Sequence, residues 1–114
     1  MTDLADLDFC YLTTVGRTSG RPHRIEIWFA LQEGTVYLLS GGRDASDWVR
    51  NVMASPGVTL QIGEETRQTR ARVIAPDTQE DATARRLLVE KYRGPSDDLA
   101  AWGRTSLPVG IDWS

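Results

Sequence analysis

Cysteine and histidine are almost absent from this chain of 114 residues, since Cys10 and His23 occur once each. A single cysteine excludes an internal disulfide, and its apolar neighbours indicate a buried, unreactive thiol. One histidine and one cysteine are too few for a His/Cys metal cluster, so we expect no metal site. His23 has no obvious nucleophile partner for a Ser/His/Asp triad, and we therefore assign no catalytic residue.

Long hydrophobic runs and excess positive charge are also missing. No apolar stretch is long enough to span a bilayer, and the acidic N-terminus is unlike a signal peptide, so a cytoplasmic protein is expected. The formal net charge of -3 gives no reason to expect nucleic-acid binding, and any anion site must come from local clustering. With 40% hydrophobic and 25% charged residues, the chain is typical of one globular domain over residues 1–114.

Alternating hydrophobicity predicts a protein built mainly from β-strands. Five or six strands are expected, at 10–15, 23–31, 35–40, 58–62, 66–75 and, interrupted by Pro108 and Gly110, at 107–113. The first three resemble an antiparallel meander joined by turns at 16–22 and 32–34. Because an open sheet exposes its edges, short antiparallel connections favour closure into a small barrel.

Two helices are expected between these strands. The first covers about 44–54, with Asp44 as N-cap and Asp47 completing a capping box. Its apolar stripe consists of Ala45, Trp48, Val49, Val52 and Met53. The second is capped by Asp77, runs to about Tyr92 and stops at Gly94-Pro95.

The segment from Gly16 to Arg24 is the first candidate for chemistry. Its sequence is Gly-Arg-Thr-Ser-Gly-Arg-Pro-His-Arg, which combines three arginines and a histidine with hydroxyls and a flexible backbone. Such a loop can surround a phosphate with charge-assisted hydrogen bonds. A solvated hairpin tip would carry the same residues, and the segment alone does not decide between the two.

A second candidate is Ser40-Gly41-Gly42-Arg43, directly before the first helix. Glycines let a ligand approach the backbone closely, and a helix N-terminus attracts polar groups. Because Asp44 and Asp47 compete for the same amides, a ring carbonyl or hydroxyl fits better here than a bare anion. The alternative is a strand-to-helix connection that needs a positive φ.

Trp28 is out of phase with the apolar residues of its strand. Ile25, Ile27, Phe29 and Leu31 share one face, and Arg24, Glu26, Trp28 and Ala30 share the other. A tryptophan on the polar face must be covered by a ligand, a partner subunit or the long second helix. On the first helix, Trp48 is most simply a core residue, whereas Asn51 could bind a ligand or cap a strand.

Several motifs together resemble the deazaflavin-dependent nitroreductase family. They are Leu12 to Pro22, Ile27-Trp28-Phe29, Leu39 to Gly42, Asp47 to Asn51, Ser55 to Val58 and Trp102 to Val109. Their order and spacing cover nearly the whole chain. The resemblance implies a split β-barrel of the flavin-mononucleotide-binding, pyridoxamine-phosphate-oxidase-like type. It also implies coenzyme F420, an 8-hydroxy-5-deazaflavin with a phosphate and a glutamate tail, as hydride donor to a quinone, nitro compound or enone.

The resemblance also implies roles for individual residues. The phosphate role falls on Arg17, Thr18 and Ser19, with His23, Arg24 and Ile25 on the following strand. The ring role falls on Trp28, Ser40, Gly41, Gly42 and Arg43. The helix contacts fall on Trp48, Val49, Arg50 and Asn51. Trp28 and Trp102 would line the substrate side. Thr18 and His23 stand where the family often has lysine and arginine.

Two other functions remain open on the same fold. One is an oxidoreductase that uses flavin mononucleotide (FMN), and the other is a non-catalytic carrier of a small ligand or cofactor. A homodimer is a further expectation. The basic strand with Arg67, Arg70 and Arg72 is interpreted as a solvated face, a dimer surface or a contact for a ligand tail.

Overall fold

The computed structural model describes residues 3–94 and 99–113. In these residues the strands are β1 (Cys10–Val15), β2 (Pro22–Ile27), β3 (Ala30–Gln32), β4 (Thr35–Ser40), β5 (Gly57–Ile62), β6 (Glu65–Val73) and β7 (Leu107–Asp112). The helices are α1 (Asp47–Ala54), α2 (Gln79–Tyr92) and α3 (Ala100–Thr105), with short 3-10 turns η1 (Leu4–Asp6) and η2 (Arg43–Ala45). In the described part of the chain, no helix combines the length and apolarity needed to cross a membrane.

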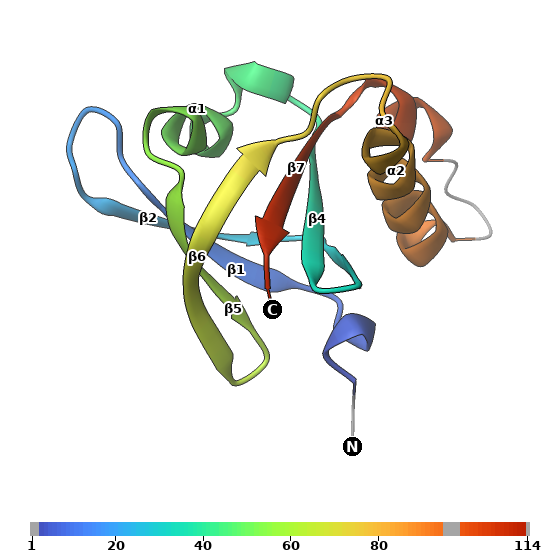
Figure 1. Ribbon diagram of the computed structural model, residues 1–114, viewed down its shortest axis with the longest axis horizontal. Coiled ribbons are helices and arrows are strands. Elements are labelled where there is room, and N and C mark those ends of the chain that lie inside the picture. Colours follow the sequence, from blue (N-terminus) through green and yellow to red (C-terminus); the bar gives the residue numbers. More distant parts are fainter. Residues whose placement is uncertain (1–2, 95–98, 114) are drawn as a thin grey trace.

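The strands form one antiparallel sheet in the order β2-β1-β5-β6-β7-β4-β3. Figure 1 shows this sheet curled into a half-open barrel, with α1 at one end and α2 and α3 beside β4. The predicted mainly-β split barrel is therefore confirmed. Strands β2 and β3 are the two edges of the sheet, although they are close neighbours in sequence.

The predicted continuous strand over 23–31, and with it the three-strand meander, is wrong. β2 pairs with β1 as far as Ile27, whereas β3 pairs with β4 from Ala30 onward. Between them the backbone N–H of Phe29 donates to the Tyr92 hydroxyl (3.0 Å) and its carbonyl accepts from the Lys91 ammonium (2.9 Å). Because α2 supplies these partners, the chain can leave one sheet edge for the other without burying unsatisfied backbone groups.

Both predicted N-caps are wrong by one or two residues. α1 begins at Asp47 with Ser46 as N-cap, so Asp44 lies in η2 instead. α2 begins at Gln79, and the Thr78 hydroxyl accepts from the Asp81 N–H (3.1 Å). Asp77 has φ 61°, a left-handed turn conformation that precedes the cap.

The remaining boundaries follow the predicted pattern with smaller changes. β5 and β6 match the expected strands at 58–62 and 66–75 within two residues, and α2 ends at Tyr92 as expected. Of the predicted stop Gly94-Pro95, the proline lies outside the described residues. β7 continues through Pro108 and Gly110 without the expected interruption. α3 was not predicted.

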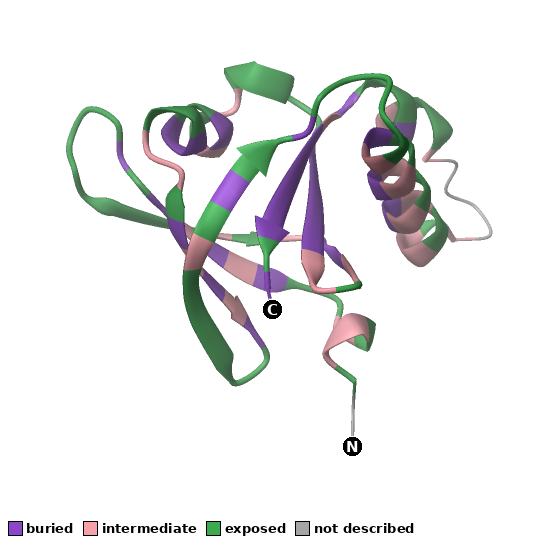
Figure 2. Ribbon diagram, in the orientation of Figure 1, coloured by how far each residue is buried: buried purple, intermediate pink, exposed green. Residues whose placement is uncertain are grey.

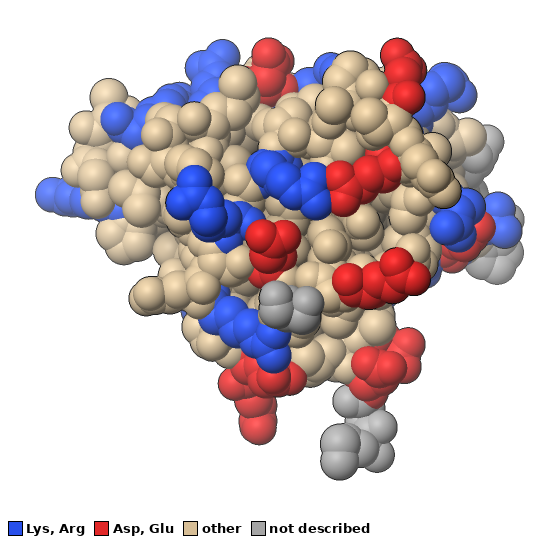
Figure 3. All heavy atoms as spheres, in the orientation of Figure 1, with Lys and Arg blue, Asp and Glu red and all other residues tan. Residues whose placement is uncertain are grey.

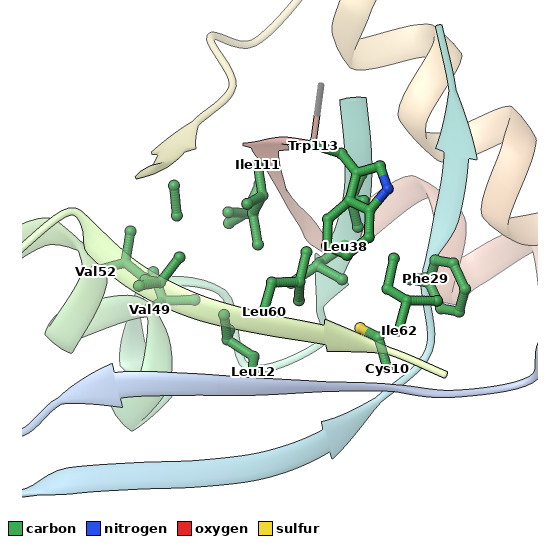
Figure 4. Packing of buried hydrophobic residues seen from close by; sticks show 14 residues of the cluster. Cys10, Leu12, Phe29, Leu38, Val49, Val52, Leu60, Ile62, Ile111 and Trp113 are labelled. Atoms are coloured by element: carbon green, nitrogen blue, oxygen red, sulfur yellow. The ribbon is translucent and has the colours of Figure 1, made fainter. Parts of the chain in front are cut away.

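The core consists of two clusters of buried side chains. The larger lies inside the curled sheet and includes Cys10, Leu12, Leu38, Leu60 and Ile111. Figure 4 shows these side chains pointing toward one another, and Figure 2 shows burial concentrated along β4 and β7. Cys10 is fully buried, and burial raises the pKa of its thiol to about 12, as expected of an unreactive core cysteine. The second cluster fills the space between the sheet and α2.

Candidate functional site

A pocket of 430 Å³ opens between the β1–β2 connection and helix α1. We call it the loop pocket. Its lining residues are Thr14, Gly16, Arg17, Thr18, Ser19, His23, Arg24, Ile25, Asp47, Trp48 and Asn51. All six residues predicted for the phosphate role therefore lie in one concavity, together with two of those predicted on the helix.

Gly16 determines the shape of the β1–β2 connection. Its N–H donates to the Arg21 carbonyl and its carbonyl accepts from the Gly20 N–H, both at 2.8 Å. A Cβ atom at position 16 would lie 2.6 Å from both His23 Nε2 and Ser19 Oγ, closer than real contacts allow. Gly20 closes the turn with φ 70°, a value that glycine adopts without strain.

Asn51 ties this connection to helix α1. Its Oδ1 accepts from the backbone N–H of Arg17 (3.2 Å) and from Arg17 Nη1 (2.9 Å). Its Nδ2 donates to Thr14 Oγ1 (3.0 Å). Asn51 is only 3% exposed. Its bonds therefore hold the Arg17 side chain in the pocket wall from the buried side.

Arg17 also pairs with Asp47, the residue that begins α1. Its Nη2 lies 3.2 Å from Asp47 Oδ1, and its Nη1 donates to the Asp47 carbonyl (3.4 Å). The Asp47 side chain is 86% exposed, so water screens the pair and its contribution to stability is small. Asp47 nevertheless places a negative charge in the wall of a pocket otherwise suited to anions.

The other residues predicted on the first helix point in different directions. Trp48 lines the loop pocket and packs against the core. Val49 is fully buried in the core, and Arg50 is exposed and donates to the Asp44 carbonyl (3.1 Å). Of the predicted apolar stripe, Val52 is buried, whereas Met53 is largely exposed.

The segment Ser40 to Arg43 lies outside the loop pocket. Ser40 is buried, and its hydroxyl donates to the Arg43 carbonyl (3.0 Å) and lies 2.7 Å from Ser46 Oγ. Arg43 has φ 53°, so the positive φ expected in this connection is present but falls on the arginine rather than on a glycine. Its Nη1 donates to the Thr105 carbonyl (2.6 Å), which links the connection to α3.

Glycines 41 and 42 differ in how closely their neighbours approach. A Cβ atom at Gly42 would lie 2.6 Å from Ser46 Oγ, whereas one at Gly41 would make an ordinary contact, 3.6 Å from the Trp102 ring. The backbone of this connection therefore lies beside the indole of α3. A ligand that contacts Gly41 would also be near Trp102.

The long helix covers Trp28, one of the three alternatives that the sequence left open. The Trp28 ring stacks on Tyr92 of α2 with centroids 4.2 Å apart and planes 1° apart. Trp102 meets it edge-on, at 5.7 Å and 87°. These contacts fix the orientation of the Trp28 ring, and its residual exposure faces a second pocket.

This second pocket also measures 430 Å³, and we call it the aromatic pocket. It is lined by Phe9, Glu26, Ile27, Trp28, Leu39, Leu99 and Trp102. Edge strand β2 supplies residues 23–25 to the loop pocket and residues 26–27 to the aromatic pocket, and Trp28 follows directly. One short stretch of backbone thus connects a basic, hydroxyl-rich pocket with an aromatic one.

Alternation and composition did not single out several residues of these pockets. Glu26 was assigned to a polar strand face, and Phe9, Leu39 and Leu99 carried no signal beyond hydrophobicity. Tyr92 is the last residue of α2 and lies 64 positions after Trp28. A short-range hydrophobic pattern in the sequence cannot show that the two residues are in contact. The alternating strand did place Glu26 on the same face as Arg24 and Trp28, which was the one available signal.

The basic strand β6 is largely paired within the molecule. Arg72 forms a two-fold hydrogen-bonded ion pair with Glu80 (2.5 and 2.7 Å), and Arg67 stacks over the Trp113 ring (4.2 Å). Arg70 is exposed, and its side chain makes no hydrogen bond or ion pair with the described residues. On the face shown in Figure 3, basic and acidic side chains are interspersed.

A family model described as F420H(2)-dependent quinone reductase matches residues 1–113. The chain belongs to this family. No curated protein matches the sequence significantly. This F420H2-dependent reductase is thus an oxidoreductase with coenzyme F420 as its cofactor, and the predicted recognition is confirmed.

Solved structures share the fold, and one of them is described as an F420-H2 dependent reductase. The F420-H2 dependent reductase FDR-A is 25% identical, with a TM-score of 0.72 over 98% of this chain and 99% of that one. A protein described as a domain-swapped dimer is also 25% identical, with a TM-score of 0.73 over 92% and 79% of the two chains. The haem storage protein HutZ from Vibrio cholerae shares the fold at 13% identity, with a TM-score of 0.75 over 94% and 82%.

The loop pocket of this F420H2-dependent reductase fits the phosphate of its cofactor. Arg17 supplies positive charge at its wall, and Arg24 also lines the pocket, although its guanidinium lies over the Tyr11 ring (4.4 Å). The side chains of Thr18 and His23, both exposed, make no hydrogen bond within residues 3–94 and 99–113, so their polar atoms are available to a ligand. A phosphate prefers this combination of guanidinium groups, hydroxyls and backbone amides.

Proposed function

We propose that the protein transfers a hydride from reduced F420 to an electron-poor small molecule, a quinone, nitro compound or enone. The cofactor phosphate would occupy the loop pocket and the acceptor the aromatic pocket. The observation that carries this proposal is the continuous stretch His23 to Trp28, which lines one pocket and then the other. A cofactor with an anionic end and a flat ring matches that change in character.

Arg17, Thr18 and Ser19 would hold the phosphate, together with His23 and Arg24. Asn51 and Asp47 already restrain the Arg17 guanidinium in the pocket wall. A restrained guanidinium loses less side-chain entropy on binding than a free one, which favours affinity. Arg24 and the exposed residues of the loop would also attract the acidic tail of the cofactor.

The ring would lie along Ser40 to Arg43, beside Trp102 of the aromatic pocket. Reduced F420 supplies the hydride from its central ring. The backbone amides of Gly41 and Gly42 would polarise the ring and stabilise charge that develops on it. Trp48 and Asn51 would flank the cofactor from α1, with Val49 supporting them from the core and Arg50 reaching the solvent side.

Trp28 and Trp102 would bound the acceptor. Their orientations are fixed by the stack on Tyr92 and by the edge-on contact between them. The two indole planes stand at 87° to each other, so they would form two adjoining apolar walls for a planar acceptor and exclude water from the reacting face. We assign no acid or base to the protein, and the accompanying proton would come from solvent or from a cofactor group.

Binding of the cofactor tests the first half of the proposal. Purified protein is titrated with F420 and, separately, with FMN, and binding is followed by absorbance and fluorescence. We expect F420 to bind at micromolar concentration and FMN more weakly. Tight FMN binding and a yellow purified protein would instead favour the FMN-dependent alternative, and no binding of either would contradict both.

Two arginines of one loop provide a matched comparison. Arg17→Ala should weaken F420 binding about tenfold or more, because charge-assisted hydrogen bonds to a phosphate are lost. Arg21→Ala removes the same charge from the same loop, but Arg21 does not line the pocket. Equal losses of F420 affinity in the two variants would mean that Arg17 acts only through general electrostatic attraction.

Turnover tests the second half. We expect F420H2 oxidation with menadione, a nitroarene or an enone, and in Trp28→Ala the KM for the acceptor should rise more than the Kd for F420 does. Tight F420 binding without oxidation by any of these acceptors would support the cofactor-carrier alternative instead.

Assembly and location belong to the same proposal. We treat residues 1–114 as one cofactor-binding domain that forms a homodimer, since one similar structure is described as a domain-swapped dimer. Light scattering of the eluting protein measures the assembly, and a monomeric mass would contradict it. A cytoplasmic location stays a prediction that cell fractionation tests.

A further inference from the structure

A single carboxylate stands at the wall of the aromatic pocket. Glu26 is the one charged side chain among the described residues that line it. The other lining side chains are Phe9, Ile27, Trp28, Leu39, Leu99 and Trp102, all hydrophobic. Glu26 is exposed, so water screens its charge in part, but the charge still acts on a ligand that binds beside it.

The neighbours of Glu26 hold the carboxylate without neutralising it. The Tyr11 hydroxyl donates to Glu26 Oε2 (3.0 Å). Arg24, the nearest cation along the strand, lies instead over the Tyr11 ring (4.4 Å) and donates to Gln61 Oε1 (3.0 Å). Within the described residues Glu26 forms no ion pair. The bond to Glu26 raises the pKa of Tyr11, as expected for a phenol that donates to an ionised carboxylate.

We propose that Glu26 determines which acceptors the enzyme accepts, by selecting uncharged and cationic molecules over anionic ones. Quinones, nitroarenes and enones without a charged substituent would enter the pocket, and those with a sulfonate or carboxylate would be repelled. This inference rests on the proposed function, because it requires the acceptor to bind in the aromatic pocket. The acceptors would then have to be both electron-poor and free of negative charge.

The test compares 1,4-naphthoquinone with its 2-sulfonate. Intrinsic reactivity differs between the two, so the quantity of interest is the ratio of their kcat/KM values in each variant. Glu26→Gln removes the charge at nearly constant shape, and Glu26→Lys reverses it. Glu64→Gln is the matched control, since it makes the same change in net charge in the exposed β5–β6 turn, away from both pockets.

We expect kcat/KM for the sulfonate to rise about threefold in Glu26→Gln and about tenfold in Glu26→Lys, as for a unit charge several ångström away in a largely aqueous setting. The uncharged quinone and the Glu64→Gln variant should stay within about twofold of the unmodified protein. High salt should reduce the gains by screening. Tyr11→Phe keeps the charge and should keep the selectivity.

An unchanged ratio in both Glu26 variants would overturn the inference while leaving the proposed function intact. If F420H2 reduces neither quinone in the unmodified protein, the proposed function fails separately. Binding then decides the role of Glu26, because Trp28 and Trp102 report ligands in this pocket by fluorescence quenching. The sulfonate should bind more tightly in Glu26→Lys than in the unmodified protein, and equal Kd values would overturn the inference.

Discussion

The side-chain carbonyl of Asn51 accepts two hydrogen bonds from Arg17, one from its backbone N–H (3.2 Å) and one from its guanidinium (2.9 Å). One buried amide on α1 thereby sets the position of both the backbone and the charge of a residue 34 positions earlier. The wall of the loop pocket is consequently assembled in advance of any ligand. This relationship gives the first of four predictions.

Asn51→Leu should weaken F420 binding about tenfold, because Arg17 loses its support. It should also lower the free energy of unfolding by about 2–4 kcal/mol, since three hydrogen bonds of a buried side chain disappear. Fluorescence titration and urea denaturation measure the two effects. Thr14→Val is the control: it removes only the acceptor of Asn51 Nδ2, so stability should fall with little loss of affinity. Equal affinity losses would show that Asn51 acts through general stability.

Asp47→Asn should tighten F420 binding by about twofold to fivefold, because a negative charge leaves a pocket that receives an anion. Stability should change little, since the pair with Arg17 is solvent-exposed. The gain should shrink as salt rises. Asp44→Asn makes the same charge change outside the pocket lining and should have a smaller effect. A loss of affinity in Asp47→Asn would mean that its bond to Arg17 matters more than its charge.

Gly16→Ala should reduce F420 affinity, because the new Cβ would overlap His23 Nε2 and Ser19 Oγ and displace two side chains proposed to hold the phosphate. Both atoms end exposed side chains that can rotate away, so the free energy of unfolding should change by less than about 1 kcal/mol. Gly57→Ala is the matched control, since no atom lies within 4 Å of its added Cβ. Thermal melts and titrations of the two variants separate a general glycine effect from the close approach at position 16.

Stability should fall as pH rises above about 9, because Cys10 and Tyr92 keep their protons longer in the folded than in the unfolded state. Burial raises the pKa of each group to about 12, from 9.0 and 10.0. Their stabilising effect is therefore complete below the unfolded pKa values and lost as pH approaches 12. Each group contributes a slope of about 1.4 kcal/mol per pH unit.

Urea denaturation between pH 8 and 10 measures this slope. In Cys10→Ala the slope between pH 9 and 10 should be shallower, although the variant is less stable at every pH. Burial lowers the pKa of Lys91, whose effect has the opposite sign and partly offsets the slope. A slope that is the same with and without Cys10 would contradict the burial of a protonated thiol.

The strands of this fold could be predicted from the sequence, because hydrophobic alternation reflects which side chains face the core. The break after Ile27 could not, since it depends on Tyr92 and Lys91 from a distant helix. The N-cap predictions were wrong because of the local backbone conformation before each helix. Asp44 and Asp77 are good capping residues, but Ser46 and Thr78 stand closer to the helices. The φ values of 53° at Arg43, next to Asp44, and of 61° at Asp77 belong to turns that precede the helices.

The candidate site likewise has one part that could be predicted from the sequence and one part that could not. The residues predicted for the phosphate all lie within positions 17–25, and a short turn brings residues so near in sequence together. The aromatic pocket depends on α2 and α3, and α3 has only six residues, too few for a hydrophobic period. Trp28 and Trp102 were identified, but the residue that stacks on Trp28 and the carboxylate beside it required the structure.

The two pockets draw their lining residues from different parts of the sequence. Every residue of the loop pocket lies between positions 14 and 51, whereas the aromatic pocket draws on positions 9 to 102. If the acceptor binds in the aromatic pocket as proposed, substitutions in α3 would alter the acceptor range without changing a residue of the loop pocket. Such a division lets descendants of one gene diversify their substrates while inheriting the same coenzyme.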